Sequence, residues 1–287
     1  MQILKGLFSP ILAIFRFINN YFKALIFLLV LFLLFSPNSE IKTPNLAQID
    51  IKGAIFDANE VILALENAKN DKNIKGVLLY IDSPGGALSP SVELFMQVKS
   101  LAKTKKVVAY AGGNMTSGSY YAGVSADKII ANPGAFIGSI GVIMQVPNIG
   151  ELAQKIGVKE QSVKAGEFKE AGTFMREWSE TERASLQGLV NKSYELFSSD
   201  VAAARGLDIK RRDEWANARV FLASDAVKLG LVDRLGGYFD AKKELEILSG
   251  VSEPVWQETP KFEQFLQKIT NQSANSLLNA LFNLSVR

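Results

Sequence analysis

The chain has 287 residues and a net charge of +3, with 48% hydrophobic and 21% charged residues. This balance excludes a disordered chain and a polytopic membrane protein, and the small net charge, without a basic stripe, excludes a nucleic-acid-binding protein. The absence of cysteine and histidine excludes disulfides, thiol nucleophiles, zinc–thiolate sites and an imidazole base, so a hydrolase of this composition needs a lysine, a carboxylate or a water on an oxygen-liganded metal.

An apolar run from Ala24 to Phe35 dominates the N-terminal segment. Together with its flanks it predicts a transmembrane anchor at residues 21–37, just long enough to cross a bilayer core of roughly 30 Å. A cleavable signal peptide is the alternative, because a run of this length also suits the hydrophobic region of such a peptide. The long preceding segment and the poor cleavage site at 36–40 favour the uncleaved anchor.

The charges before this run predict its orientation. Lys5, Arg16 and Lys23 are present, and no acidic residue accompanies them. The positive-inside rule therefore predicts that residues 1–20 form a cytoplasmic or interfacial segment. The chain after Pro37 is then expected on the outer side of the cytoplasmic membrane.

Strand and helix patterns alternate after a polar linker at residues 38–45. Apolar runs typical of buried strands and amphipathic helical patterns follow one another along the chain. The predicted strands are 46–55, 76–81, 106–110 and 128–131, and the predicted helices are 58–68, 91–102 and 117–125. Such alternation is typical of β-α-β units, so we expect one α/β domain at residues 46–250.

Two further features complete this organisation. Ser179 and Glu182 have the spacing of a capping box and predict the start of a long helix. Residues 251–287 show an amphipathic pattern and are expected to form a C-terminal tail.

Two glycines, Gly85 and Gly86, follow the strand predicted at 76–81. Because glycine has no Cβ, their backbone N–H groups can turn toward a ligand. These amides could form one half of an oxyanion hole. Taken alone, the pair is more typical of a plain strand-to-helix turn.

A serine, Ser117, lies among small residues after the strand predicted at 106–110. Small neighbours at a strand-to-helix turn expose the hydroxyl and let the next amide, that of Gly118, point to the same place. Ser117 is therefore a candidate nucleophile. A helix N-cap, the commonest use of such a serine, is the alternative.

Lys169 ends the segment K-A-G-E-F-K, which begins at Lys164. A lysine acts as a general base only when its amine is largely neutral, and burial favours that form by penalising the charged one. The chain holds 32 basic residues, most of them expected in solvent. Spacing alone therefore gives Lys169 only a weak claim.

Short motifs follow one another in a fixed order from Asp82 onward. They are D-S-P-G-G at Asp82–Gly86, T-S-G-S-Y-Y-A at Thr116–Ala122, A-D-K-I-I-A-N-P at Ala126–Pro133, G-S-I-G-V at Gly138–Val142, K-A-G-E-F-K at Lys164–Lys169 and N-A-R-V-F-L-A-S-D-A-V-K-L-G-L-V-D at Asn217–Asp233. The ordered set resembles the signal peptide peptidase A family (peptidase family S49) in its short single-domain form. This resemblance implies a Clp/crotonase-like domain of layered β-β-α units behind one N-terminal transmembrane helix.

The resemblance also implies a serine–lysine dyad. Ser117 aligns with the family's nucleophile and Lys169 with its general base, while Ser139 corresponds to a hydroxyl that orients the lysine amine. The absence of histidine agrees with this expectation, because a serine–histidine–aspartate triad cannot be built here.

An oxyanion hole and an apolar pocket are expected beside the dyad. By analogy with Clp-type proteases, the amide of Gly85 or Gly86 and the amide of Gly118 would form the oxyanion hole. Candidate lining residues of the pocket are Ala87, Met115 and Met144. The carboxylates show no metal-ligand spacing, so neither a metal nor another cofactor is expected.

The chain departs from the family pattern at a few positions. Ser119 follows Gly118 where the family usually has a second glycine, and Glu170 stands where aspartate or serine is common. Asn217 and Ala218 replace a glycine that often precedes this segment. None of these changes removes a catalytic atom.

The implied activity is that of a serine endopeptidase that degrades cleaved signal peptides and other hydrophobic peptides at the outer face of the cytoplasmic membrane. A domain tethered beside the bilayer would meet such peptides at high effective concentration. Family members of this length form homo-oligomers, in which Ser117 of one protomer can face Lys169 of the next. No nucleic-acid partner is expected.

Two other functions fit parts of the sequence. A crotonase-like enzyme would hold a thioester enolate with similar glycine amides, but coenzyme A is cytoplasmic and the chemistry does not need a serine–lysine pair. A membrane-anchored scaffold with an inactive protease fold would be favoured by loss of a dyad residue, and both residues are present. We therefore predict the peptidase.

Overall fold

The computed structural model describes residues 16–31 and 43–257, and the chain divides into two compact units, Met1–Thr43 and Pro44–Arg287. In the first unit, residues 16–31 are helical and expose large apolar side chains. No helix within the described ranges is both long enough and apolar enough to cross a membrane. The anchor expected at 21–37 continues past residue 31, and that continuation lies outside the described residues.

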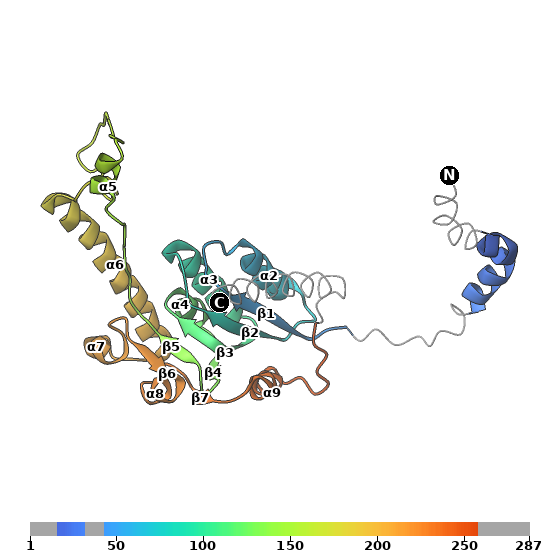
Figure 1. Ribbon diagram of the computed structural model, residues 1–287. Helices are drawn as coiled ribbons and strands as arrows, with labels where there is room; N and C mark the ends of the chain where they lie inside the picture. The colour runs from blue at the N-terminus through green and yellow to red at the C-terminus, as the bar shows by residue number, and fades with distance from the viewer. Residues whose placement is uncertain (1–15, 32–42, 258–287) are drawn as a thin grey trace, which may run out of the picture. The chain divides into compact units, whose positions relative to one another are not determined.

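Strands and helices alternate through the second unit, as the sequence predicts (Figure 1). The strands are β1 (Leu46–Lys52), β2 (Gly76–Ser83), β3 (Lys106–Thr116), β4 (Lys128–Ala131), β5 (Phe136–Gly138), β6 (Val220–Leu222) and β7 (Arg234–Leu235). The helices are α2 (Asn59–Asn70), α3 (Leu88–Ala102), α4 (Gly118–Gly123), α5 (Gly150–Lys155), α6 (Glu180–Arg205), the 3-10 turn η1 (Ile209–Arg211), α7 (Arg212–Trp215), α8 (Ala223–Lys228) and α9 (Tyr238–Ser249).

A mostly parallel sheet forms the centre of this unit. Strands β1, β2, β3, β4 and β7 lie side by side in this order, and each neighbouring pair is parallel. The end of β3, from Asn114 to Thr116, pairs instead with β5, and β6 runs antiparallel to β5. The predicted α/β class is confirmed.

Helices cover both faces of the sheet, and the side chains of β2 alternate between two cores. Val77, Leu79 and Ile81 belong to the larger core, which also holds buried residues of α2, α3, α4 and α6. Leu78 belongs to a smaller core on the other face, closed by Leu245 of α9. Because both faces are covered, β2 is apolar at nearly every position rather than at every second one.

The chain returns to the outer edge of β1 after α9. The amide of Gln257 donates to the carbonyl of Leu46 at 2.8 Å, and the amide of Asn45 donates to the carbonyl of Val255 at 2.8 Å. The first residues of the tail expected at 251–287 are thus tied to the sheet. The rest of that tail lies outside the described residues.

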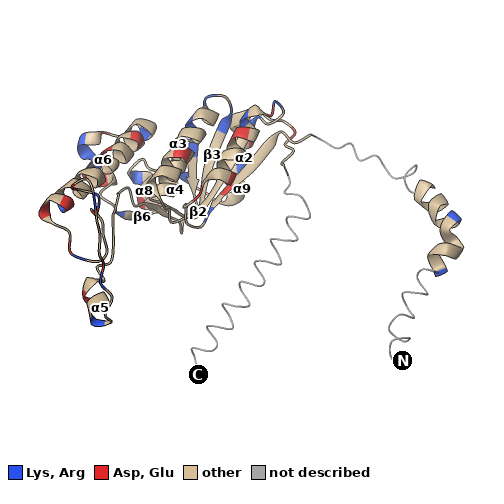
Figure 2. Cartoon of the chain, turned by 90° about the horizontal axis from the view of Figure 1, so that it is seen from above, with Lys and Arg blue, Asp and Glu red and all other residues tan. Residues whose placement is uncertain are grey.

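A projecting arm, which we define as residues 141–179, connects the region after β5 with α6. Figure 1 shows α5 beyond the N-terminal end of α6, away from the sheet, and Figure 2 shows basic and acidic residues interspersed along α6. The helix begins with the predicted capping box of Ser179 and Glu182. Apart from Glu182, its buried residues lie in the C-terminal half, where Phe197 and Val201 enter the core.

Candidate active site

Ser117 occupies a strained turn between β3 and α4. Its backbone has φ 52° and ψ −124°, although it is not glycine, a conformation that costs on the order of 1–3 kcal/mol. Its amide donates to the carbonyl of Gly138 at 2.7 Å, and its carbonyl accepts from the amide of Tyr121 at 3.0 Å. The half-buried side chain makes no capping hydrogen bond to α4. Ser117 therefore has the geometry of a presented hydroxyl rather than of a helix cap.

The glycine turn after β2 packs directly against the Ser117 turn. An ideal Cβ on Gly85, whose φ is +89°, would lie 2.5 Å from the amide nitrogen of Gly118. The amide of Gly85 is already occupied, because it donates to the hydroxyl of Ser83 at 3.1 Å. The amides of Gly86 and Gly118 have no hydrogen-bond partner among the described residues. These two N–H groups remain available to a ligand.

A cavity of about 180 Å³ lies beside Ser117. Gly86 and Gly118 line it, together with Ala87, Ser91, Tyr121, Val142 and Phe197. The rings of Tyr121 and Phe197 are stacked, with centroids 4.3 Å apart and planes at 13°. Burial raises the pKa of the Tyr121 phenol, and the hydrogen bond that its hydroxyl donates to Asp200 raises it further. The phenol therefore stays neutral, and the cavity wall combines apolar side chains with polar groups in similar amounts.

Of the pocket residues expected from the sequence, Ala87 lines this cavity and the two methionines do not. Met115 is fully buried in the core, where its Cε lies 2.8 Å from an ideal Cβ on Gly123. Met144 lines a separate hollow in the arm together with Trp178. The sequence alone thus does not distinguish an apolar side chain that lines a pocket from one that is buried in the core.

The cavity also contains residues that the sequence did not single out as functional. Phe197 lies in none of the sequence motifs, and Tyr121 lies in one only as a neighbour of the candidate nucleophile. Ser91 is 1% exposed and donates from its hydroxyl to the carbonyl of Ala87 at 2.8 Å. The helical periodicity places such residues on an inward face, but it does not show that a cavity lies there.

Ser139 follows the residue that accepts the Ser117 amide bond. Its own amide donates to the carbonyl of Arg219 at 2.7 Å, and its φ of 51° marks a second tight bend. The half-buried Ser139 is therefore close in the fold to the Ser117 turn. The strand pairing of β5 with the end of β3 holds these two bends together.

Lys169 lies in the arm, in an exposed turn. Its amide donates to the carbonyl of Gly166 at 3.3 Å, and its side chain has no hydrogen bond or ion pair with any described residue. The next residue, Glu170, accepts hydrogen bonds from Lys164 at 2.8 Å and from Arg176 at 3.3 Å. Ser162 also donates to Glu170. Glu170 thus fixes the turn while leaving the lysine side chain free.

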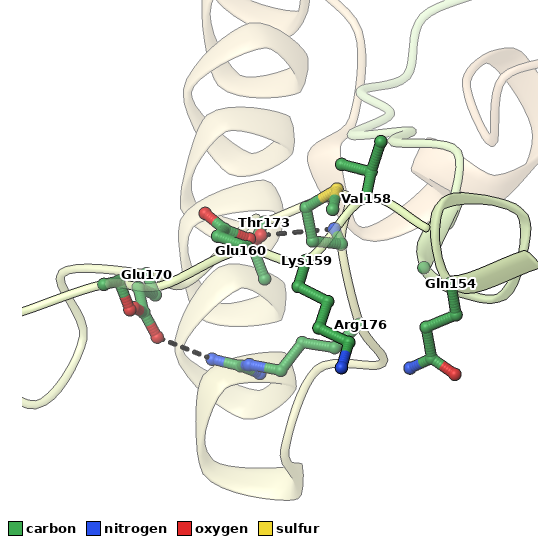
Figure 3. A pocket seen from close by; sticks show the side chains of 10 residues that line it. Gln154, Val158, Lys159, Glu160, Glu170, Thr173 and Arg176 are labelled. Carbon is green, nitrogen blue, oxygen red and sulfur yellow. Dashed lines mark hydrogen bonds and ion pairs between the residues drawn. The ribbon is translucent and has the colours of Figure 1, made fainter. Parts of the chain in front are cut away.

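Arg176 connects this turn to α6. Figure 3 shows its guanidinium extended toward Glu170 across a cavity of about 530 Å³. The same guanidinium forms two hydrogen bonds of 2.8 Å with Glu182. The pKa of Glu170 is lowered to about 2, mainly by the hydrogen bond from Lys164. The pKa of Glu182 is also lowered to about 2, mainly by the hydrogen bonds from Arg176. Both carboxylates are therefore charged at neutral pH, and the turn is anchored to the helix start.

The length of α6 separates Lys169 from Ser117 within one chain. Glu182 anchors the Lys169 turn, whereas Phe197 lines the Ser117 cavity. A helix rises about 1.5 Å per residue, so these two positions are about 22 Å apart along α6. Lys169 does not line the cavity beside Ser117. One chain brings together Ser117, Gly86 and Gly118, but not Lys169.

Comparisons with known proteins agree on one family. The family model described as peptidase family S49 matches residues 99–252. A putative protease of Synechocystis sp. is 38% identical over 209 residues, covering 72% of this chain and 75% of that protein. A putative protease of Methanocaldococcus jannaschii is 38% identical, covering 69% of this chain and 64% of that protein. A putative signal peptide peptidase SppA of Enterococcus faecium is 33% identical, covering 70% of this chain and 63% of that protein.

Proposed function

The chain belongs to peptidase family S49, and we propose that it is a serine endopeptidase in which Ser117 is the nucleophile and Lys169 the general base. The observation that carries this proposal is the Ser117 turn. It presents a hydroxyl in a strained bend, with two unpaired amides and a cavity beside it. This arrangement suits acyl transfer, in which a nucleophile and oxyanion donors must converge on one carbonyl.

The proposed reaction forms and then breaks an acyl-enzyme. The neutral amine of Lys169 accepts the proton of the Ser117 hydroxyl while the serine oxygen attacks the scissile carbonyl. The amides of Gly86 and Gly118 stabilise the resulting oxyanion. Lysine then gives the proton to the departing amine. A water, deprotonated by the same lysine, attacks the acyl group, and lysine returns this proton to the oxygen of Ser117 as the acid leaves. Ser139 is proposed to orient the lysine amine by a hydrogen bond.

We assign the oxyanion hole to Gly86 rather than Gly85 because their amides differ in occupancy. The Gly85 amide already donates to Ser83, whereas the Gly86 amide has no partner in the described part of the chain. A donor that must first leave an internal hydrogen bond gains less from the oxyanion. Gly85 instead supplies the left-handed bend, with φ 89°, that turns the next amide toward Ser117.

The dyad is proposed to form between two copies of the chain. The separation along α6 supports this, since Lys169 and Ser117 do not meet within one copy. The arm also exposes large apolar side chains, among them Ile143 at 81%, Ile156 at 69% and Val163 at 105% of their full accessibility. Exposed apolar groups of this density favour a protein contact. An arm that reaches the next protomer in a head-to-tail ring would supply its lysine there.

We propose hydrophobic peptides, including released signal peptides, as substrates at the outer face of the cytoplasmic membrane. The apolar groups of Tyr121, Val142 and Phe197 in the cavity wall support an apolar side chain next to the cleaved bond. The name of the Enterococcus faecium relative supports signal peptides as substrates, and the apolar run at residues 24–35 supports an anchor at 21–37. A Clp/crotonase-like arrangement of the α/β domain fits a ring of such protomers.

The test is hydrolysis of a fluorogenic hydrophobic peptide by the full chain in detergent. Ser117→Ala and Lys169→Ala should each abolish hydrolysis while folding and assembly stay intact. Lys159→Ala is the matched control, because Lys159 is another exposed lysine of the arm, and it should keep wild-type activity. Full activity of either dyad variant would overturn the mechanism and return attention to the crotonase-like and scaffold alternatives.

A further inference from the structure

Ser119 has a fully buried hydroxyl in the turn that presents Ser117. The amide of Thr116 donates to this hydroxyl at 2.9 Å. The hydroxyl in turn lies 2.6 Å from the carbonyl of Ser83 and 2.9 Å from the carbonyl of Thr116. Since a hydroxyl carries one proton, it donates to one carbonyl at a time, and the shorter distance favours Ser83.

The bond between Ser119 and Ser83 joins two segments that carry different active-site amides. Ser83 ends β2, and its side-chain hydroxyl accepts from the amide of Gly85 at 3.1 Å. The regular pairing of β2 with β3 shifts register between Ile81 and Ser83 and resumes with Ser83 opposite Met115, so the ladder is irregular near the strand ends. Two buried serine hydroxyls add side-chain hydrogen bonds at this irregular junction.

We propose that Ser119 is a positioning residue that sets the distance between the amides of Gly86 and Gly118. This inference rests on the proposed serine peptidase function, in which both amides must reach one oxyanion. Gly86 follows the β2 end that Ser83 holds, and Gly118 directly precedes Ser119. Because a misplacement of 1 Å in such a site costs about 100-fold in rate, a fixed link between the two segments is of direct catalytic value.

The Ser119 hydroxyl differs from other buried serine hydroxyls in the segments that it connects. Ser198 of α6 is also fully buried, but its hydroxyl donates to the carbonyl of Tyr194, one turn earlier in the same helix. Ser119 instead connects residues that are 36 positions apart in the sequence. Loss of the Ser198 hydroxyl affects one helix, whereas loss of the Ser119 hydroxyl lets the two amide-bearing segments move relative to each other.

The experiment compares Ser119→Ala and Ser83→Ala with Ser198→Ala as the matched buried-serine control. The full chain in detergent is assayed for kcat, KM and inhibition by a peptide boronate, whose tetrahedral adduct with Ser117 resembles the transition state. Ser119→Ala and Ser83→Ala should lower kcat at least ~10-fold and weaken the boronate in parallel, with KM within about twofold. Ser198→Ala should leave all three values unchanged.

Thermal unfolding and oligomer size are measured on every variant, so that loss of structure is separated from loss of positioning. If Ser119→Ala unfolds below the assay temperature, Ser119→Cys, which replaces the hydroxyl by a weak donor of similar size, decides the question by the same thresholds. Wild-type kcat and boronate affinity in a folded Ser119→Ala enzyme would overturn the inference while leaving the peptidase intact. Residual hydrolysis by Ser117→Ala would instead overturn the proposed function itself.

Discussion

Two positions in the candidate site, Gly86 and Gly118, have no room for a side chain. An ideal Cβ on Gly118 would lie 2.2 Å from the hydroxyl oxygen of Ser91 and 3.2 Å from the amide nitrogen of Gly86. An ideal Cβ on Gly86 would lie 2.1 Å from the carbonyl oxygen of Ile55. A methyl group at either glycine therefore displaces one of the two free amides.

Replacement of Gly118 by alanine tests this requirement. Gly118→Ala is expected to lower kcat by about 100-fold or more, because the added Cβ pushes the Gly118 amide away from the place of the oxyanion. The measurement is peptide hydrolysis by protein whose fold is verified by circular dichroism. Near-wild-type kcat would show that this amide is not an oxyanion donor.

A second glycine-to-alanine change gives the matched control. Gly188 lies within α6, and an ideal Cβ there meets no atom within 4 Å. Gly188→Ala should keep wild-type kcat and raise the free energy of unfolding by about 1 kcal/mol, because alanine is the better helix former. Urea denaturation measures this gain, and a loss of stability would contradict the described surroundings of Gly188.

The sequence predicts the turn around Ser117, but it does not predict which other residues line the adjacent cavity. Gly85, Gly86, Ser117 and Gly118 follow buried apolar strands, and the ends of parallel strands meet at one edge of a sheet. Their proximity therefore follows from the pattern. The contact of Phe197 with the same cavity depends on how α6 crosses the core, which periodicity does not contain.

Among the elements, the long central strands are predictable and the short outer ones are not. The runs at 76–81 and 128–131 carry their own burial signal and lie within β2 and β4. Strands β5, β6 and β7 have only two or three residues each and form by pairing with neighbours already in place. Tertiary contact rather than local propensity creates them.

The link between the arm and α6 is expected to weaken in acid. The pKa of Glu182 is lowered from its usual 4.5 to about 2, first by the hydrogen bonds from Arg176. A carboxyl with a depressed pKa stabilises the folded form above its usual pKa, and that contribution is lost as the pH falls toward the depressed value. The arm should therefore loosen between pH 4.5 and about 2.

Fluorescence of Trp178 can report this change, because its indole donates to the carbonyl of Thr173 within the arm. In a Trp215→Phe/Trp256→Phe background, the emission should shift over the stated pH range. Arg176→Met should give the shifted emission already at neutral pH. Arg211→Met, which removes an exposed ion pair with Glu214 elsewhere, is the control and should behave as the parent. Equal emission of the two variants would contradict the role of Arg176 in holding the arm to α6.

At the scale of the whole molecule, α6 is a spacer between the two parts of the proposed site. Its C-terminal half is fixed in the core that contains Ser117, and its first turn holds the Lys169 turn through Arg176. The sequence places both dyad residues in family motifs, but motif order carries no information about how far an arm extends. The spacer length supports the proposal that the two residues meet through a second copy.

A mixing experiment distinguishes a shared dyad from one formed within each chain. Ser117→Ala and Lys169→Ala are each inactive as proposed, but the first keeps its lysine and the second its serine. If the subunits are mixed equally and exchange freely, a site between neighbours has an intact serine in half of the cases and an intact lysine in half, so about one quarter of wild-type activity should return in a head-to-tail ring.

The same mixture should stay inactive if each chain builds its own dyad, because every chain lacks one of the two groups. The double variant Ser117→Ala/Lys169→Ala, mixed with wild-type chain, is the control. In a shared site it should reduce activity to about one quarter, whereas independent chains would keep about one half. Native mass spectrometry shows that subunits have exchanged, and mixed assemblies without any recovered activity would contradict a dyad shared between protomers.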